Sequence, residues 1–209
     1  ISFLLIDDLT SPGISIRPIS SLDGHVEQCE VFFDGVRVPT SNLLGEENDG
    51  WTVAKYLLKE ERGGYSYYIA AQRLLAVIDR LREDPLCEPS DADWQRQRVM
   101  LAAEVEALRC FEYRQVTADP TLPDTAASMC KLAGTELAQR LDELAAALMG
   151  PWLGVVQGDV WGLQERDVPL GPGAGVGVMR HYLNNRAATI YGGSAQIQRN
   201  LIARALVNR

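Results

Sequence analysis

The sequence has few of the residues that metal centres and hydrolytic triads require. Its 209 residues include only two histidines, His25 and His181, which disfavours an imidazole-based metal site or a histidine-dependent triad. The four cysteines, at positions 29, 87, 110 and 130, show no CxxC spacing. We therefore expect no metal site, and we interpret the scattered thiols as a sign of a reducing compartment, the cytoplasm.

Long apolar runs and an excess of positive charge are also missing. Charged residues interrupt every apolar stretch, so no membrane span is expected. Acidic residues outnumber basic ones by 28 to 20, and the net charge of −8 disfavours nucleic acid as a partner. The apolar run at 1–6 lacks the basic segment of a signal peptide. Since the chain does not begin with methionine, we interpret it as a fragment or a processed chain.

Residues 1–40 have the pattern of β structure. Alternating apolar residues follow the turn at 11–13, and Asp23-Gly24 is a hairpin signal. A second strand pattern runs from Val26 to Pro39, and 43–50 is expected to be a loop. An ordinary small β sheet would show the same pattern.

From Trp51 the apolar period becomes helical. It predicts one helix from 51 to about 81, with Gly63-Gly64 tolerated inside it. Further helices are expected from 89–91 onward, over about 124–149, and after Ser194, with 150–177 as loop. Long amphipathic helices with short connections favour an antiparallel bundle. We predict an α+β, mainly α fold: a partial β domain over 1–48 and a helical bundle over 49–209.

A glycine turn precedes the last helix. Tyr191-Gly192-Gly193 breaks the chain, and Ser194 stands where an N-cap belongs. Backbone amides at such a turn can hold an oxyanion, a carbonyl or a phosphate. An ordinary capped helix start would look the same.

Glu61 is the carboxylate that the helical pattern places on an apolar face. It lies one turn from both Leu58 and Tyr65. Desolvation raises the pKa of a buried carboxyl group, which suits a general base near neutral pH. The alternative is a structural ion pair with Arg62 or another basic residue.

Two parts of the sequence resemble the acyl-CoA dehydrogenase family. Asn185-Arg-Ala-Ala-Thr-Ile-Tyr-Gly-Gly-Ser194, continuing into Ile197-Gln-Arg-Asn200, is similar to its C-terminal signature. The strings at 31–39 and 44–51 resemble the second half of its middle β domain. The resemblance implies the C-terminal portion of a flavoprotein that carries out α,β-dehydrogenation of an acyl-CoA with FAD, by removal of the α-proton and transfer of the β-hydride to the flavin.

The resemblance also implies a base. Many members carry a glutamate directly after the tyrosine of the final glycine turn, where this chain has Gly192. Others, such as the long-chain and isovaleryl types, place it on the first helix of the C-terminal domain before an arginine, and Glu61-Arg62 matches that pattern. Glu61 is therefore the predicted base, with Glu60 as the second choice.

The remaining site residues are carried over from the same motifs. The Gly192 amide would bind the thioester carbonyl, Tyr191 would line the acyl pocket, and Gly193 would let the thioester approach. Ser194, Ala195 and Gln196 match positions that contact the flavin nucleotide, and Arg62 resembles a residue near the CoA moiety. A plain salt bridge is the alternative for Arg62, and exposed helix surface is the alternative for Gln196 and Arg199.

Some family features are missing from the chain. Residues 91–98 do not show the family's arginine followed three residues later by a phenylalanine, a pair that binds the flavin pyrophosphate across a subunit interface. Residues 147–151 keep only one glycine of a Gln-x-x-Gly-Gly segment. A homo- or hetero-tetramer that accepts acyl-CoA and passes electrons to an electron-transfer flavoprotein or similar acceptor is expected. The alternatives are a non-catalytic partner subunit of a heteromeric enzyme, or oxidase-like chemistry on the same fold.

Overall fold

The computed structural model describes residues 1–61, 66–87, 92–155 and 169–207, with only the backbone described at 59–61 and 92. The chain divides into two compact units, residues 1–65 and 66–209. The predicted division after residue 48 stays a prediction.

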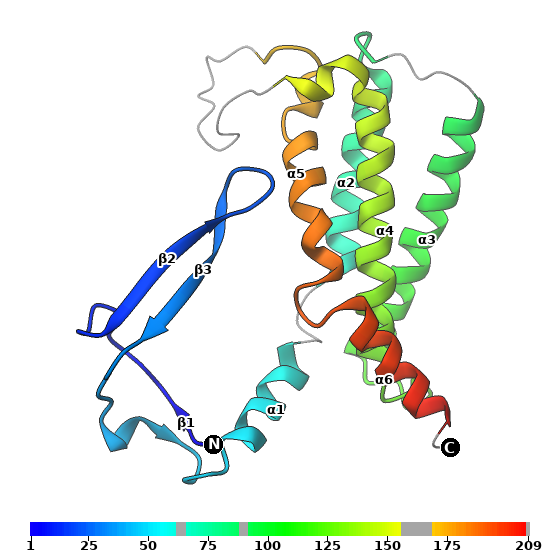
Figure 1. Ribbon diagram of the computed structural model, residues 1–209. Coiled ribbons are helices and arrows are strands. Elements are labelled where there is room, and N and C mark those ends of the chain that lie inside the picture. Colours follow the sequence, from blue (N-terminus) through cyan, green and yellow to red (C-terminus); the bar gives the residue numbers. More distant parts are fainter. Residues whose placement is uncertain (62–65, 88–91, 156–168, 208–209) are drawn as a thin grey trace. The chain divides into compact units, whose positions relative to one another are not determined.

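The first unit is built from short antiparallel strands and one helix (Figure 1). Strands β2 (Ile14–Ser20) and β3 (Val26–Phe33) form the predicted hairpin, and Gly24 in its turn has a φ of +83°. Strand β1 (Phe3–Leu4) pairs with β4 (Leu43–Leu44), which follows the 3-10 helix η1 (Thr40–Asn42). Helix α1 (Gly50–Glu61) ends the described part of this unit.

Two strand predictions are corrected. The strand expected to reach Pro39 ends at Phe33, because the chain turns at Gly35, whose φ is +61°. The segment at 43–44, predicted as loop, is instead a strand, because it can pair with the apolar N-terminal residues Phe3 and Leu4.

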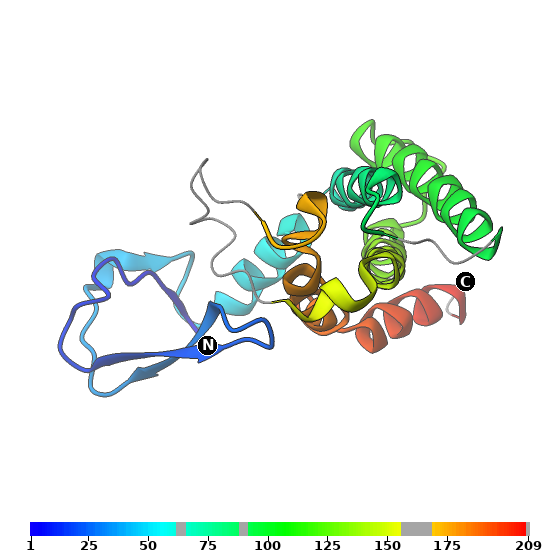
Figure 2. The ribbon, with the colours of Figure 1, turned by 90° about the horizontal axis from the view of Figure 1, so that it is seen from above.

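The second unit is the predicted antiparallel helical bundle. Helices α2 (Tyr67–Glu83), α3 (Ala92–Val116) and α4 (Ala126–Met149) lie side by side (Figures 1 and 2). The shorter α5 (Val178–Asn184) and α6 (Ala195–Val207) complete it. Helix α4 is the centre, because it packs against the other four. Its buried side chains meet those of α2 and α3 in one core, which includes Leu74, Ile78, Leu81, Leu101, Val105, Leu108, Leu137, Leu141, Leu144 and Leu148.

The prediction of one continuous helix over 51–81 is wrong. Ser66 is extended and caps a new helix, with its Oγ accepting a hydrogen bond from the Ile69 amide. Glu112 of α3 adds a second cap, because its carboxylate accepts the Tyr68 N–H at 2.9 Å and the Ser66 hydroxyl at 2.7 Å. The glycine pair at 63–64 lies outside the described residues. Leu57 and Leu58, predicted to face the core, are exposed.

The segment between α4 and α6 holds more structure than predicted. Two 3-10 helices, η2 (Gly150–Gly154) and η3 (Gly173–Gly175), flank residues 156–168, which lie outside the described residues. Helix α5 and the 3-10 helix η4 (Asn185–Thr189) then lead into the glycine turn. No helix in the described part is long and apolar enough to cross a membrane.

Candidate functional site

The glycine turn between η4 and α6 is the centre of the candidate site. Gly192 and Gly193 both have left-handed backbones, with φ of +62° and +86°. The Ser194 hydroxyl then accepts the Ile197 amide at 3.4 Å, so Ser194 caps α6 as predicted. Within the residues that the structure describes, no acceptor meets the Gly192 N–H. The turn therefore offers a backbone donor at the start of a helix.

The Gln198 side chain contacts the glycine turn from the protein interior. Its side chain is fully buried, and its Nε2 donates to the carbonyl oxygens of Gly192 at 3.4 Å and Gly193 at 3.1 Å. Gly193 is packed against it, since a Cβ there would lie 2.5 Å from that nitrogen. The first turn of α6 thus holds both glycine carbonyls.

Helix α4 fixes the segment that leads into the turn. The buried ammonium of Lys131 donates to the Ala188 carbonyl at 3.0 Å, and desolvation lowers the pKa of Lys131. Gln139 Nε2 donates to the Asn185 carbonyl at 2.9 Å. Both contacts attach η4 to α4.

The buried carboxylate of Asp142 connects α5 to α4. Asp142 is 1% exposed, and its two oxygens meet His181 Nδ1 and Asn185 Nδ2, each at 2.6 Å. The hydrogen bond with Asp142 raises the pKa of His181, against the opposing effect of burial. The Asp142 carboxylate therefore holds one residue of α5 and one of η4.

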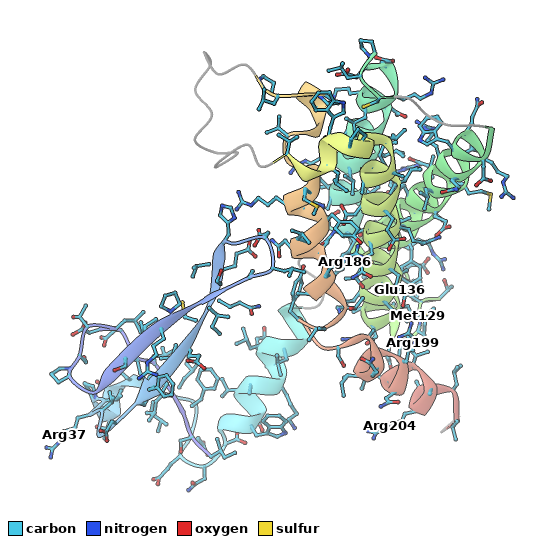
Figure 3. All side chains as sticks on the ribbon, turned by 45° about the horizontal axis from the view of Figure 1, so that its top comes forward. Arg37, Met129, Glu136, Arg186, Arg199 and Arg204 are labelled. Carbon is cyan, nitrogen blue, oxygen red and sulfur yellow. The ribbon has the colours of Figure 1, made fainter. Side chains whose placement is uncertain are left out.

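Surface ion pairs add to this attachment. Arg199 of α6 pairs with Glu136 of α4, and Figure 3 shows the two side chains close together. Arg186 reaches Glu143 at 3.2 Å and lies over the Tyr182 ring at 4.3 Å. Arg199 is exposed, so the helix-surface interpretation of this residue fits the structure.

The sequence-predicted site residues fall on both units. Glu61 is the last residue of α1 in the first unit, and Arg62 lies outside the described residues. Gly192 belongs to the second unit, so its partnership with Glu61 stays a prediction. Tyr191 is half-exposed and Gln196 exposed, whereas Ala195 is buried.

The groups around the turn fit a polar, anionic ligand. The positive end of the α6 helix dipole attracts negative charge, and Ser194 and Gln196 add hydroxyl and amide groups. These donors suit the polar edges of a flavin nucleotide, and the Gly192 N–H suits a carbonyl oxygen. No group of three or more metal-ligating side chains is found in the described part of the chain.

Sequence reasoning missed several residues that build the site. Gln198 lies three residues after the buried Ala195, and Lys131 and Asp142 interrupt the apolar pattern of α4. The signal that identified Glu61, a polar residue on an apolar helix face, would also have identified these three.

Comparison with known proteins supplies the family. The model described as "Acyl-CoA dehydrogenase, C-terminal domain" matches residues 48–207. Acyl-CoA dehydrogenase IpdE1 of Mycobacterium tuberculosis is 32% identical over 97% of this chain and 49% of its own length. The mitochondrial long-chain specific acyl-CoA dehydrogenase of Rattus norvegicus is 26% identical over 87% of this chain and 40% of its own length.

Solved structures share the fold. The chain superimposes on the ChsE4–ChsE5 complex of Mycobacterium tuberculosis with a TM-score of 0.76 at 24% identity, covering 100% of this chain and 52% of that chain. The protein belongs to the acyl-CoA dehydrogenase family, which confirms the resemblance and the fold class predicted from sequence. It spans about half the length of the curated relatives that it matches.

Proposed function

We propose that the complete protein catalyses α,β-dehydrogenation of an acyl-CoA thioester. The observation that carries the proposal is the Gly192 N–H, which has no acceptor among the described residues and stands in a turn that Gln198 and α4 hold in place. Charge builds on the thioester oxygen as the α-proton leaves. A preorganised backbone donor at that oxygen lowers the barrier, because it binds the charged state more strongly than the ground state.

Glu61 is the proposed base that removes the α-proton. Supporting this role are its place at the end of α1 and the glycine at 192, where other family members carry their glutamate. Arg62 would bind near the CoA moiety, Tyr191 would line the acyl pocket, and Gly193 would leave room for the thioester. Glu60 is the second choice as base.

The proposed cofactor is FAD. When bound, the flavin accepts the β-hydride, and an electron-transfer flavoprotein or a similar acceptor is the proposed partner that takes the electrons onward. Ser194, Ala195 and Gln196 are the residues proposed to hold the nucleotide, through one hydroxyl, one amide side chain and the helix N-terminus. A cytoplasmic location stays a prediction.

We also propose that the chain works in an assembly, as a homo- or hetero-tetramer. Exposed apolar residues on α3 and the likeness to a chain of a two-component complex support this. A non-catalytic partner subunit is the second candidate function, motivated by the missing pyrophosphate-binding residues at 91–98. Oxidase chemistry on the same fold would be distinguished by rapid reaction of the reduced protein with oxygen.

The test replaces Glu61 by Gln in the protein expressed from its complete reading frame. We expect turnover of an acyl-CoA panel to fall by at least about 10²-fold, the usual contribution of a positioned base, while acyl-CoA still binds. Glu60→Gln is the matched comparison and should retain turnover.

Three outcomes are informative. Loss of turnover only in Glu60→Gln would assign the base to Glu60. Turnover that survives both substitutions would contradict the assignment of the base. If such turnover also requires a second dehydrogenase-like chain that co-purifies, the protein is the partner subunit.

A further inference from the structure

Gln198 is buried in a way that stability does not require. The side chain is 0% exposed, and its Oε1 meets no donor within the described part of the chain. Burying an unpaired amide oxygen is costly, and an apolar side chain of similar size, such as methionine, would avoid that cost. The amide must therefore contribute something that an apolar side chain could not.

Its contribution is a pair of hydrogen bonds to the glycine turn. The Nε2 donates to the carbonyl oxygens of two consecutive residues, Gly192 and Gly193. Both residues have positive φ, a region where glycine samples many conformations at little cost. Holding both carbonyls restricts the peptide planes on either side of Gly193, and it limits the orientations open to the turn.

The geometry points to Gln198 as a positioning residue for the Gly192 amide in the reaction proposed above, on which this inference rests. Gln198 does not touch the substrate in this scheme. It holds the two peptide planes that directly follow the Gly192 Cα from the protein interior, and it thereby limits the directions open to the Gly192 N–H. Gly193 contributes to the same arrangement, because a residue without a Cβ leaves room for Nε2 of Gln198.

This role predicts a particular kinetic effect. A misdirected amide loses most where the charge on the thioester oxygen is largest, which is the transition state. Gln198→Met should therefore lower kcat by about 10- to 100-fold, with KM changed by less than about threefold.

Two further measurements on Gln198→Met do not depend on catalysis. The thermal midpoint should change little, because removal of the unpaired buried oxygen offsets the loss of two hydrogen bonds to the turn carbonyls. Hydrogen–deuterium exchange should become about tenfold faster at the bonded amides of Ile190, Tyr191 and Gln198, while α4 keeps its protection. Asn200→Met, on the exposed side of the same helix, is the matched control and should change none of these quantities.

A second variant reaches the same contact from the other side. Gly193→Ala places a methyl group 2.5 Å from Nε2, so it should speed exchange in the turn as Gln198→Met does. Gly24→Ala is its control, because Gly24 has a similar φ of +83° and nothing within 4 Å of the added methyl group. Both controls should keep wild-type kcat.

The outcomes separate this inference from the proposed function. Unchanged exchange in the turn, or a large loss of thermal stability with kcat and KM unaffected at low temperature, would overturn the positioning role. If Glu61→Gln leaves turnover intact while Gln198→Met both speeds exchange in the turn and lowers kcat, the base assignment fails and the positioning role stands. Equal loss in kcat and substrate binding would show that Gln198 only maintains the pocket.

Discussion

At the scale of single residues, the close packing of α2 on α4 depends on Gly134, which has no side chain. A Cβ on Gly134 would lie 2.4 Å from both Cβ and Cγ of Tyr67. Tyr67 begins α2 and packs against the buried core. The close approach of the two helices at this point therefore requires glycine.

Gly134→Ala should destabilise the protein by about 1–3 kcal/mol, measured by urea unfolding. The direction is informative, because alanine is otherwise favoured over glycine inside a helix by about 1 kcal/mol. Gly154→Ala is the control and should be close to neutral, since nothing lies within 4 Å of its added methyl group. A more stable Gly134→Ala variant would show that α2 and α4 can separate at little cost.

Prediction from sequence succeeded for single residues whose role depends only on their neighbours in the sequence. Ser194 was predicted as an N-cap and is one, because capping depends only on the next three residues. Lys131 and Gln198 were missed although each interrupts an apolar helix face, and that pattern could not have shown that their partners are backbone carbonyls. Glu61 and Gly192 lie in different units, and their proposed partnership came from the family resemblance rather than from local pattern.

At the scale of elements, α5 is attached to α4 through a titrating pair. His181 Nδ1 lies 2.6 Å from the buried Asp142 carboxylate, which raises the pKa of His181 above its ordinary value near 6.5. A raised folded-state pKa means that the pair stabilises the fold fully at pH values below the unfolded pKa. That stabilisation is lost as the pH rises through the folded pKa.

His181→Gln keeps a hydrogen-bond donor but removes the titration. We expect the wild type to exceed the variant by roughly 0.5–1 kcal/mol at pH 5.5, because the imidazole is half-exposed and partly screened. The difference should shrink by pH 9, as measured by urea unfolding at both pH values. His25→Gln gives the background for loss of the other histidine. A difference that grows with pH would contradict the assignment.

Whether a helix was predicted from the sequence depended on its length. The long helices α3 and α4 repeat their apolar pattern over many turns, and the start of α3 and both ends of α4 were predicted close to their observed positions. Helix α5 was missed because its seven residues span barely two turns and follow a glycine-rich segment. The break at Ser66 was missed because the apolar period continues on both sides of it and the glycine pair at 63–64 was interpreted as tolerated inside one helix.

At the scale of the whole molecule, α3 lacks the division of a surface helix into one apolar face and one polar face. Its inward residues Leu101, Val105 and Leu108 are buried, yet large apolar side chains also point outward. The exposed ones are Val99, Met100, Tyr113 and Val116. A helix that is apolar on several sides is normally covered on several sides, and exposed apolar patches mark interfaces.

The surface between α3 and α4 is also hollowed. One apolar groove of about 330 Å³ is lined by Phe111, Met129 and Leu137 among others. A second groove of about 440 Å³ is mixed, with Met100 and Leu144 beside the charged side chains of Arg96, Glu104, Arg140 and Glu143. We expect another chain of the same family to cover this surface in the assembly proposed above. A sister chain would present matching apolar helices, whereas a charged ligand would find little to bind in the apolar groove.

Met100→Glu tests this directly, because it places a charge on the surface expected to be covered without touching the core. Burying that carboxylate costs several kcal/mol, so the assembly should dissociate at concentrations at least tenfold higher than the wild type, as followed by sedimentation velocity. Gln95→Glu adds the same charge at an exposed polar position of α3 and should leave assembly unchanged. Because Met100 is 61% exposed and is not part of the buried core, thermal unfolding of the dissociated variant should stay cooperative. An unchanged sedimentation coefficient for Met100→Glu would mean that the second chain docks elsewhere.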